Sequence, residues 1–241
     1  MAFGTERVLT GTSVRYQAQD VIDQGLRRYM LNVYNLMGAA LALSGIAAIA
    51  VAQYEPLKQL VFGTPLVWVV MLAPIGLVLV LSFGINRLSY GAAQGVFWAF
   101  ATLMGASLAS LLIVFTGASI ARAFFATAAT FGAMSLYGYT TKRDLTAMGS
   151  FLMMGLFGIV IASLVNMFIG SNALQFAITV LSVLIFTGLT AYDTQKIKEM
   201  YLDSDVDDVM SKKALMGALT LYLDFINIFI ALVQLFGEKR E

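Results

Sequence analysis

Seven stretches of the chain are apolar over the length of a membrane-spanning helix. A bilayer core is about 30 Å thick and takes about 20 apolar residues per helix. The stretches cover roughly residues 31–53, 66–85, 91–115, 118–139, 147–169, 174–193 and 213–236. With 59% hydrophobic and 12% charged residues among 241, the chain also has more apolar surface than one soluble core could bury. The sequence therefore predicts an all-α membrane protein, a bundle of seven transmembrane helices.

Lys and Arg residues in the short connections predict how the bundle is oriented. If the N-terminus is cytoplasmic, the inside segments hold eleven of them: Arg7, Arg15, Arg27, Arg28, Arg87, Lys142, Arg143, Lys196, Lys198, Lys212 and Lys213. Only Lys58, Arg122, Lys239 and Arg240 fall outside, and we expect Arg122 to snorkel to the surface. Positive charge favours the cytoplasmic side, so we predict a cytoplasmic N-terminus. Seven spans put the C-terminus outside; six spans and a re-entrant segment would put it inside.

The chain outside these runs is short and simple. We divide it into a cytoplasmic N-terminal tail (1–30), a seven-helix transmembrane domain (31–236) and a short C-terminal tail (237–241). Small residues in the first and third runs, among them Gly38, Gly45, Gly91 and Gly95, predict close packing between helices.

Composition excludes several classes of function. The chain has no His and no Cys, which removes the usual proton switch near neutral pH, thiolate metal sites and cysteine nucleophiles. Lys and Arg (15) nearly balance Asp and Glu (14), so the charge is not that of a nucleic-acid-binding protein. We expect no cofactor.

The last apolar run carries a polar stripe around one aspartate. Residues at spacings of three and four lie on one face of a helix. This face carries Gly217, Thr220, Asp224, Asn227, Ala231 and Gln234, while Leu, Ile and Phe fill the others. The stripe is therefore predicted to face the protein interior or a cavity. Asp224 is about 16 Å into the run, near the middle of the membrane. The sixth run has a weaker stripe that includes Thr190 and ends at Asp193.

Asp193 and Asp224 are the strongest candidates for function, because a carboxylate in a membrane helix is costly and tends to be functional. The sixth and seventh runs are antiparallel, so the two carboxyl groups can share one pocket open to the cytoplasm. If they touch, they cannot both ionise cheaply, and the pair holds one proton. Deprotonated, it would repel and form a hard-oxygen site for calcium. Alternatively, each aspartate is satisfied separately by a hydroxyl or an arginine, and Arg87 is the most plausible cation.

Two segments around these aspartates resemble a known family. Residues 190–198 (TAYDTQKIK) resemble the Y-D-x-x-x-I segment of the Bax inhibitor-1 family. Residues 221–229 (LYLDFINIF) are similar to its L-Y-L-D-F-I-N-x-F segment in the last span. The similarity extends loosely over the whole chain, and the minimal connections fit the bacterial branch best.

The resemblance implies a seven-helix bundle with a central last helix and a pH-sensitive calcium leak through it. It implies that Asp193 and Asp224 form a proton-sharing pair and that Arg87 interacts with them. Some family members carry an acidic residue in the second span, which this chain lacks between residues 66 and 85. Some bacterial members also bind a membrane-anchored AAA protease.

The sequence leaves three alternative functions. The first is a calcium leak in a bacterial inner membrane, gated by the aspartates, with Thr190, Thr220 and Asn227 along the ion path. The second is a non-conducting regulator of a membrane-anchored AAA protease. The third and remotest is an intramembrane aspartyl protease. Asp224 lacks the G-x-G segment of those enzymes, and no Pro follows Pro74 to form their P-A-L segment. We therefore expect no enzymatic activity.

Overall fold

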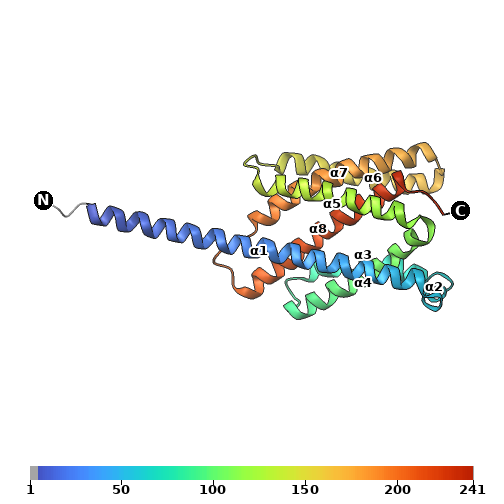
Figure 1. The fold of residues 1–241 in the computed structure, drawn as a ribbon, viewed down its shortest axis with the longest axis horizontal. Helices are drawn as coiled ribbons and strands as arrows, with labels where there is room; N and C mark the ends of the chain where they lie inside the picture. The colour runs from blue at the N-terminus through green and yellow to red at the C-terminus, as the bar shows by residue number, and fades with distance from the viewer. Residues whose placement is uncertain (1–4, 241) are drawn as a thin grey trace.

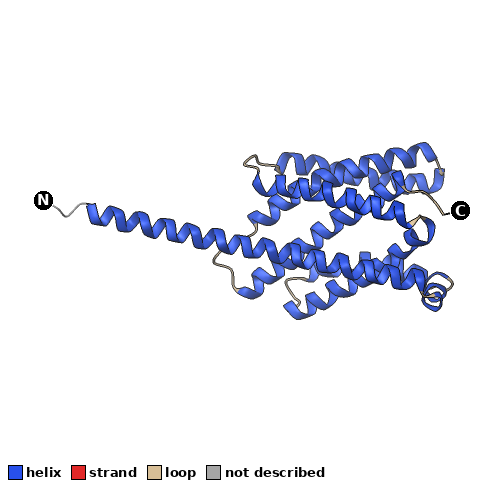
Figure 2. Cartoon of the chain, in the orientation of Figure 1, coloured by secondary structure: helices blue, strands red, loops and turns tan. Residues whose placement is uncertain are grey.

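The protein is all-helical over the residues that the structure describes. The structure is a computed structural model that describes the backbone of residues 5–240 and the side chains of residues 24–240. Within that range there are short connections and no strands, and one isolated bridge joins Phe115 to Lys239 (Figure 2). The helices are α1 (Thr5–Gln53), α2 (Glu55–Phe62), α3 (Leu66–Gly84), α4 (Tyr90–Val114), α5 (Gly117–Thr140), α6 (Thr146–Ile169), α7 (Asn172–Glu199) and α8 (Asp207–Phe236).

Six of the described helices are long and apolar enough to cross a membrane: α1 from Gln24 on, α3, α4, α6, α7 and α8. Large apolar side chains such as Phe83, Phe151 and Phe168 are exposed on the outside, as a surface that faces a bilayer requires. The remaining predicted span, the fourth run (118–139), corresponds to α5, which is 24 residues long but is not among the six. Its Ser, Thr and Gly residues lower its hydropathy, and it buries several of them inside the bundle.

Three helix boundaries differ markedly from the prediction. Helix α1 begins at Thr5, although the first run was predicted to begin at residue 31 after a tail. The sixth run was predicted to end at Asp193, but α7 continues to Glu199, and α8 begins as early as Asp207. Packing explains the extension, because Thr194, Gln195 and Ile197 are buried. The side chain of Gln195 accepts a hydrogen bond from the N–H of Leu145 and donates one to the carbonyl of Arg143. The connection before α8 is therefore only residues 200–206, and Asp193 lies inside a helix.

Helix α8 lies at the centre of the bundle (Figure 1). It packs against α1, α4, α5 and α7. Of its most apolar 18-residue window, 67% is buried, against 11–33% for the other candidate spans. The apolar faces of α8 are consequently buried as well as the polar one: Leu219, Leu221 and Phe225 are all less than 5% exposed. A polar stripe on a central helix thus does not separate an interior face from a lipid face.

Three glycines set the closest helix contacts, and none is among those predicted. A Cβ on Gly105 would collide with the backbone of Ser44, which brings α4 against α1. A Cβ on Gly138 would collide with the backbone of Ala191, and one on Gly149 with the ring of Tyr192. These two contacts seat α7 just before Asp193. By contrast, a Cβ on Gly38, Gly45, Gly91 or Gly95 would meet nothing within 4 Å, so predicting tight packing there was wrong.

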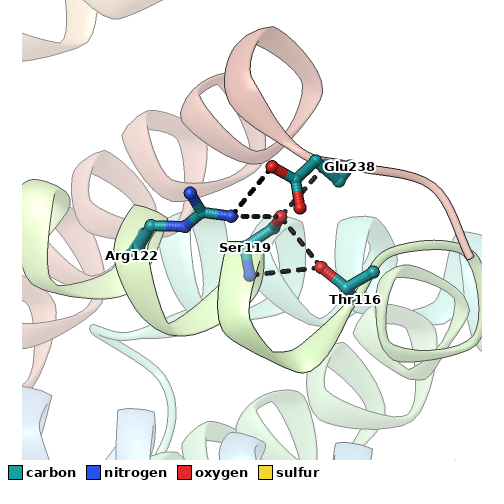
Figure 3. A network of polar contacts seen from close by, with 4 residues as sticks. All are labelled: Thr116, Ser119, Arg122 and Glu238. Atoms are coloured by element: carbon teal, nitrogen blue, oxygen red, sulfur yellow. Dashed lines mark hydrogen bonds and ion pairs between the residues drawn. The ribbon is translucent and has the colours of Figure 1, made fainter.

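A polar network ties the C-terminal tail to the start of α5 (Figure 3). Arg122 pairs with Glu238 at 3.1 Å and donates to the hydroxyl of Ser119. The N–H of Glu238 also donates to that hydroxyl, and its carbonyl accepts from the N–H of Thr116. Arg122 therefore has a partner and does not simply snorkel. Both members of the ion pair are about two-thirds exposed, so the pair itself contributes little stability.

Substituting Gly138 tests whether close packing seats α7. We expect Gly138→Ala to destabilise the protein by about 1–3 kcal/mol, because its methyl group overlaps the Ala191 backbone. The matched control is Gly132→Ala on the same helix, where a Cβ meets nothing within 4 Å. It should gain up to about 1 kcal/mol from helix propensity. Thermal unfolding in detergent, followed by circular dichroism, compares them; equal midpoints would contradict the contact.

Candidate functional site

Helices α7 and α8 bring Asp193 and Asp224 together. They pack side by side, and the two carboxyl groups lie within hydrogen-bonding reach of each other. Asp224 is 4% exposed, whereas Asp193 is only partly buried. Among the described residues, no N–H or O–H donor reaches Oδ2 of Asp224. A buried acceptor without a donor is costly, and a proton on either carboxyl group would let that group donate a hydrogen bond to the other.

Few other charges act on this pair. Apart from the two aspartates themselves, the charge that acts on Asp193 is that of Lys196, one helical turn further along α7. Lys196 is exposed, and its ammonium group lies 5.8 Å from the centre of the Tyr192 ring. Its attraction is therefore screened by solvent. Among the described side chains, exposed Lys196 is thus the one cation that acts on the buried pair.

Arg87 is not joined to the aspartates. It is exposed in the turn after α3, a helix that packs against α2 and α4. None of the four ion pairs between described side chains includes Arg87, Asp193 or Asp224. The structure thus does not show the interaction between Arg87 and the aspartates that the family resemblance implies.

The predicted polar stripe lies beside the pair but bonds within its own helices. Thr220 and Asn227 are four residues before and three after Asp224, so they share its face of α8. Each donates to the carbonyl four residues earlier, Thr220 at 3.1 Å and Asn227 at 2.8 Å. Thr190 on α7 does the same at 2.8 Å and is fully buried. Their remaining lone pairs leave oxygen acceptors close to the carboxyl groups.

A chain of hydroxyl groups next to Asp193 was not predicted from the sequence. The hydroxyl of Tyr34 on α1 bonds that of Ser135 on α5, which lies 3.1 Å from the hydroxyl of Thr194 on α7. A cavity of about 460 Å³ borders these hydroxyl groups; its lining includes Arg27, Tyr34 and Ser135. The available signal was the eight-residue spacing of Ser119, Thr127 and Ser135, which are all buried on α5.

A second unpredicted contact fixes α8 two residues before Asp224. Tyr222 is fully buried, and its hydroxyl lies 2.7 Å from that of Ser44 on α1. The Ser44 hydroxyl also lies 2.7 Å from the carbonyl of Ala101 on α4. With one proton on each hydroxyl, Tyr222 donates to Ser44 and Ser44 donates to Ala101. One serine therefore connects three helices around the site.

Comparison with known proteins identifies the family. Residues 26–241 match the family described as "Inhibitor of apoptosis-promoting Bax1". The chain belongs to the Bax inhibitor-1 family. This match confirms the resemblance that the segments around Asp193 and Asp224 indicated.

The relatives of this chain include bacterial proteins of similar length. The chain is 49% identical over 235 residues to an uncharacterised protein of Rickettsia prowazekii, covering 98% of both chains. It is 46% identical over 232 residues to the inner membrane protein YbhL of Escherichia coli K12, covering 94% of this chain and 99% of YbhL. An uncharacterised membrane protein of Streptococcus pyogenes is 37% identical over 220 residues, or 90% and 95% of the two chains. With its six apolar helices, this Bax inhibitor-1 family member is a multi-pass inner-membrane protein.

A double-mutant cycle tests the contact between Ser44 and Tyr222. Ser44→Ala leaves the buried Tyr222 hydroxyl without a partner, so we expect a loss of about 1–3 kcal/mol. Tyr222→Phe should cost less, because Ser44 keeps the carbonyls of Ala40 and Ala101 as acceptors. The double variant should lose less than the two single losses added together. Chemical unfolding in detergent measures all three, and strictly additive losses would contradict the hydrogen bond.

Proposed function

We propose that this Bax inhibitor-1 family protein is a pH-sensitive calcium leak of the bacterial inner membrane, gated by Asp193 and Asp224. One observation carries the proposal: two carboxyl groups from neighbouring membrane helices lie within hydrogen-bonding reach at a buried site. Ionisable residues inside membrane proteins are rare and generally mark ion paths or proton relays.

The proposed gate depends on a single shared proton. While the proton is present, the two carboxyl groups form a hydrogen bond that holds α7 against α8. When it leaves, two negative charges face each other, and exposed Lys196 is the one cation among the described side chains that acts on them. Their repulsion in poorly solvated surroundings favours separation of the two helices. Raising the pH therefore opens the path.

In this proposal calcium is the ion that passes and not a resident cofactor. Calcium takes six to eight oxygen ligands. The described residues contain no group of three or more Asp, Glu, His or Cys side chains that could hold a metal ion. The two carboxylates, with the oxygens of Thr190, Thr220 and Asn227 nearby, offer a weak site, which suits an ion that must leave again.

The proposal includes seven spans and a cytoplasmic N-terminus. Helix α5 rises about 36 Å over its length, enough to cross the hydrocarbon core. Its buried polar side chains lie inside the bundle, where α5 packs against α7 and α8, so lipid need not solvate them. With α5 as a span, the ends of α1, α4 and α8 and the start of α5 lie on the outer side. The cavity at Tyr34 and Ser135 then opens towards the cytoplasm.

Calcium flux into liposomes tests the gate. Purified protein is reconstituted with a calcium-sensitive dye inside, and flux is measured at mildly acidic and mildly alkaline pH. We expect flux of the wild-type protein to rise several-fold with pH. Asp193→Asn and Asp224→Asn should hold flux near the low acidic value at both pH values, because the amide keeps a hydrogen bond to the remaining carboxyl group and cannot ionise.

Asp144→Asn is the matched control for these variants. Asp144 is exposed in the loop before α6, and hydrogen bonds from the side chain and N–H of Thr146 lower its pKa. It therefore stays charged over the tested range, and its loss should not alter the pH response. Flux that is absent at every pH would contradict the leak and favour the non-conducting regulator of an AAA protease. Substrate cleavage that both aspartate variants abolish would instead revive the aspartyl protease.

A further inference from the structure

An apolar groove opens between α1, α4, α5 and α8. It has a volume of about 310 Å³, within the range of ligand pockets. Its walls include Leu41 and Ile49 from α1, Leu112 from α4, Phe125 from α5 and Phe229 from α8. The groove is lined almost entirely by apolar side chains, which suits a hydrocarbon chain.

A polar pocket with two cations continues the groove. This second pocket, also about 310 Å³, shares Ile49 and Leu112 with the groove and adds Gln53, Lys58 and Arg240. It lies where α1 and α4 end, at the side of the molecule that carries the C-terminal tail (Figure 1). The apolar groove is therefore continuous with a pocket that carries two positive charges.

The tail network fixes Arg240 in this position. The bridge between Phe115 and Lys239 pairs the tail with the turn after α4, and the N–H of Arg240 donates to the carbonyl of Val114. Nε of Arg240 donates to the carbonyl of Phe115 at 3.1 Å, which leaves its other guanidinium donors available. No described carboxylate pairs with Arg240. Lys58 has an exposed ion pair with Glu55, which occupies one of its three donors.

We propose that this composite site binds a phospholipid, with an acyl chain in the groove and the phosphate between Lys58 and Arg240. The chemistry of the two ends selects this class of ligand, because a guanidinium and an ammonium bind phosphate well. The length of the site agrees with the thickness of one bilayer leaflet, since α1 rises about 18 Å from Leu41 to Gln53. One leaflet of the hydrocarbon core is about 15 Å thick. The site goes beyond the proposed gate and does not depend on ion conduction.

Gly45 offers a way to fill the groove without disturbing the fold. It lines the groove, and a Cβ there would meet nothing within 4 Å. Gly45→Leu therefore places a side chain in the space of the acyl chain while improving helix propensity. Gly38→Leu is the matched control: Gly38 lies two turns earlier on the same face of α1, has equal space, and does not line the groove.

Native mass spectrometry of the detergent-purified protein measures the binding of phosphatidylglycerol. We expect the wild type to retain it and the Lys58→Gln, Arg240→Gln double variant and Gly45→Leu each to bind about tenfold more weakly. Gly38→Leu and Lys142→Gln, which removes an exposed cation at the far end of α5, should bind like the wild type. Diacylglycerol, which lacks the phosphate, should bind about tenfold more weakly than phosphatidylglycerol, and inorganic phosphate should not compete.

Several outcomes would overturn this proposal. Equal retention of phosphatidylglycerol by the wild type and the charge double variant would show that Lys58 and Arg240 do not hold a phosphate. Competition by inorganic phosphate alone would make this a free-anion site. A dimer in the wild type that Gly45→Leu abolishes would mean that a second copy of the chain occupies the groove. If Gly45→Leu fails to fold by circular dichroism, the charge double variant and the diacylglycerol comparison decide.

Discussion

The structure depends on the burial of one carboxyl group at the centre of a helix bundle. Asp224 is on α8, which α1, α4, α5 and α7 surround, and solvent barely reaches it. An isolated ionised carboxylate in such a place is costly, so the group needs a proton or a partner. Asp193 is the partner that the fold supplies. Gly138 and Gly149 allow α5 and α6 to approach α7 closely around Ala191 and Tyr192, and this packing brings Asp193 to the pair.

Helix α8 also connects the buried carboxyl group with the apolar groove and the C-terminal tail. Tyr222 ties α8 to α1 and α4 through Ser44, and Ser44 also lines the apolar groove. Phe225, directly after Asp224, lines that groove as well. A lipid in the groove would therefore touch the helix that carries the buried carboxyl group. Beyond α8, the tail returns to α5 through Glu238 and Arg122, so α8 is anchored at its C-terminal end.

Much of the fold and the pair itself could be predicted from the sequence. Hydrophobic run length located every long helix, and helical spacing around Asp224, with the family segments, singled out the two carboxyl groups that the structure brings together. Run length did not predict the end of α7, because packing overrides hydropathy there: the polar residues Thr194 and Gln195 are buried and continue the helix. The prediction of close packing at Gly38 and Gly45 was wrong, because a close approach depends on the partner helix, which their spacing does not reveal. The contacts of Tyr222 with Ser44, Ser135 with Tyr34 and Arg122 with Glu238 join residues more than 100 positions apart, and no local pattern predicts them.

Infrared difference spectroscopy across a pH titration tests the shared proton most directly. The protonated carboxyl group gives its own carbonyl band, well separated from that of a carboxylate. The account predicts that a band from one buried carboxyl group disappears as the pH rises, and that Asp193→Asn and Asp224→Asn each shift or remove it. Asp144→Asn should leave it in place. A wild-type protein with no such band at any pH, or a band that both aspartate variants retain unchanged, would contradict the account.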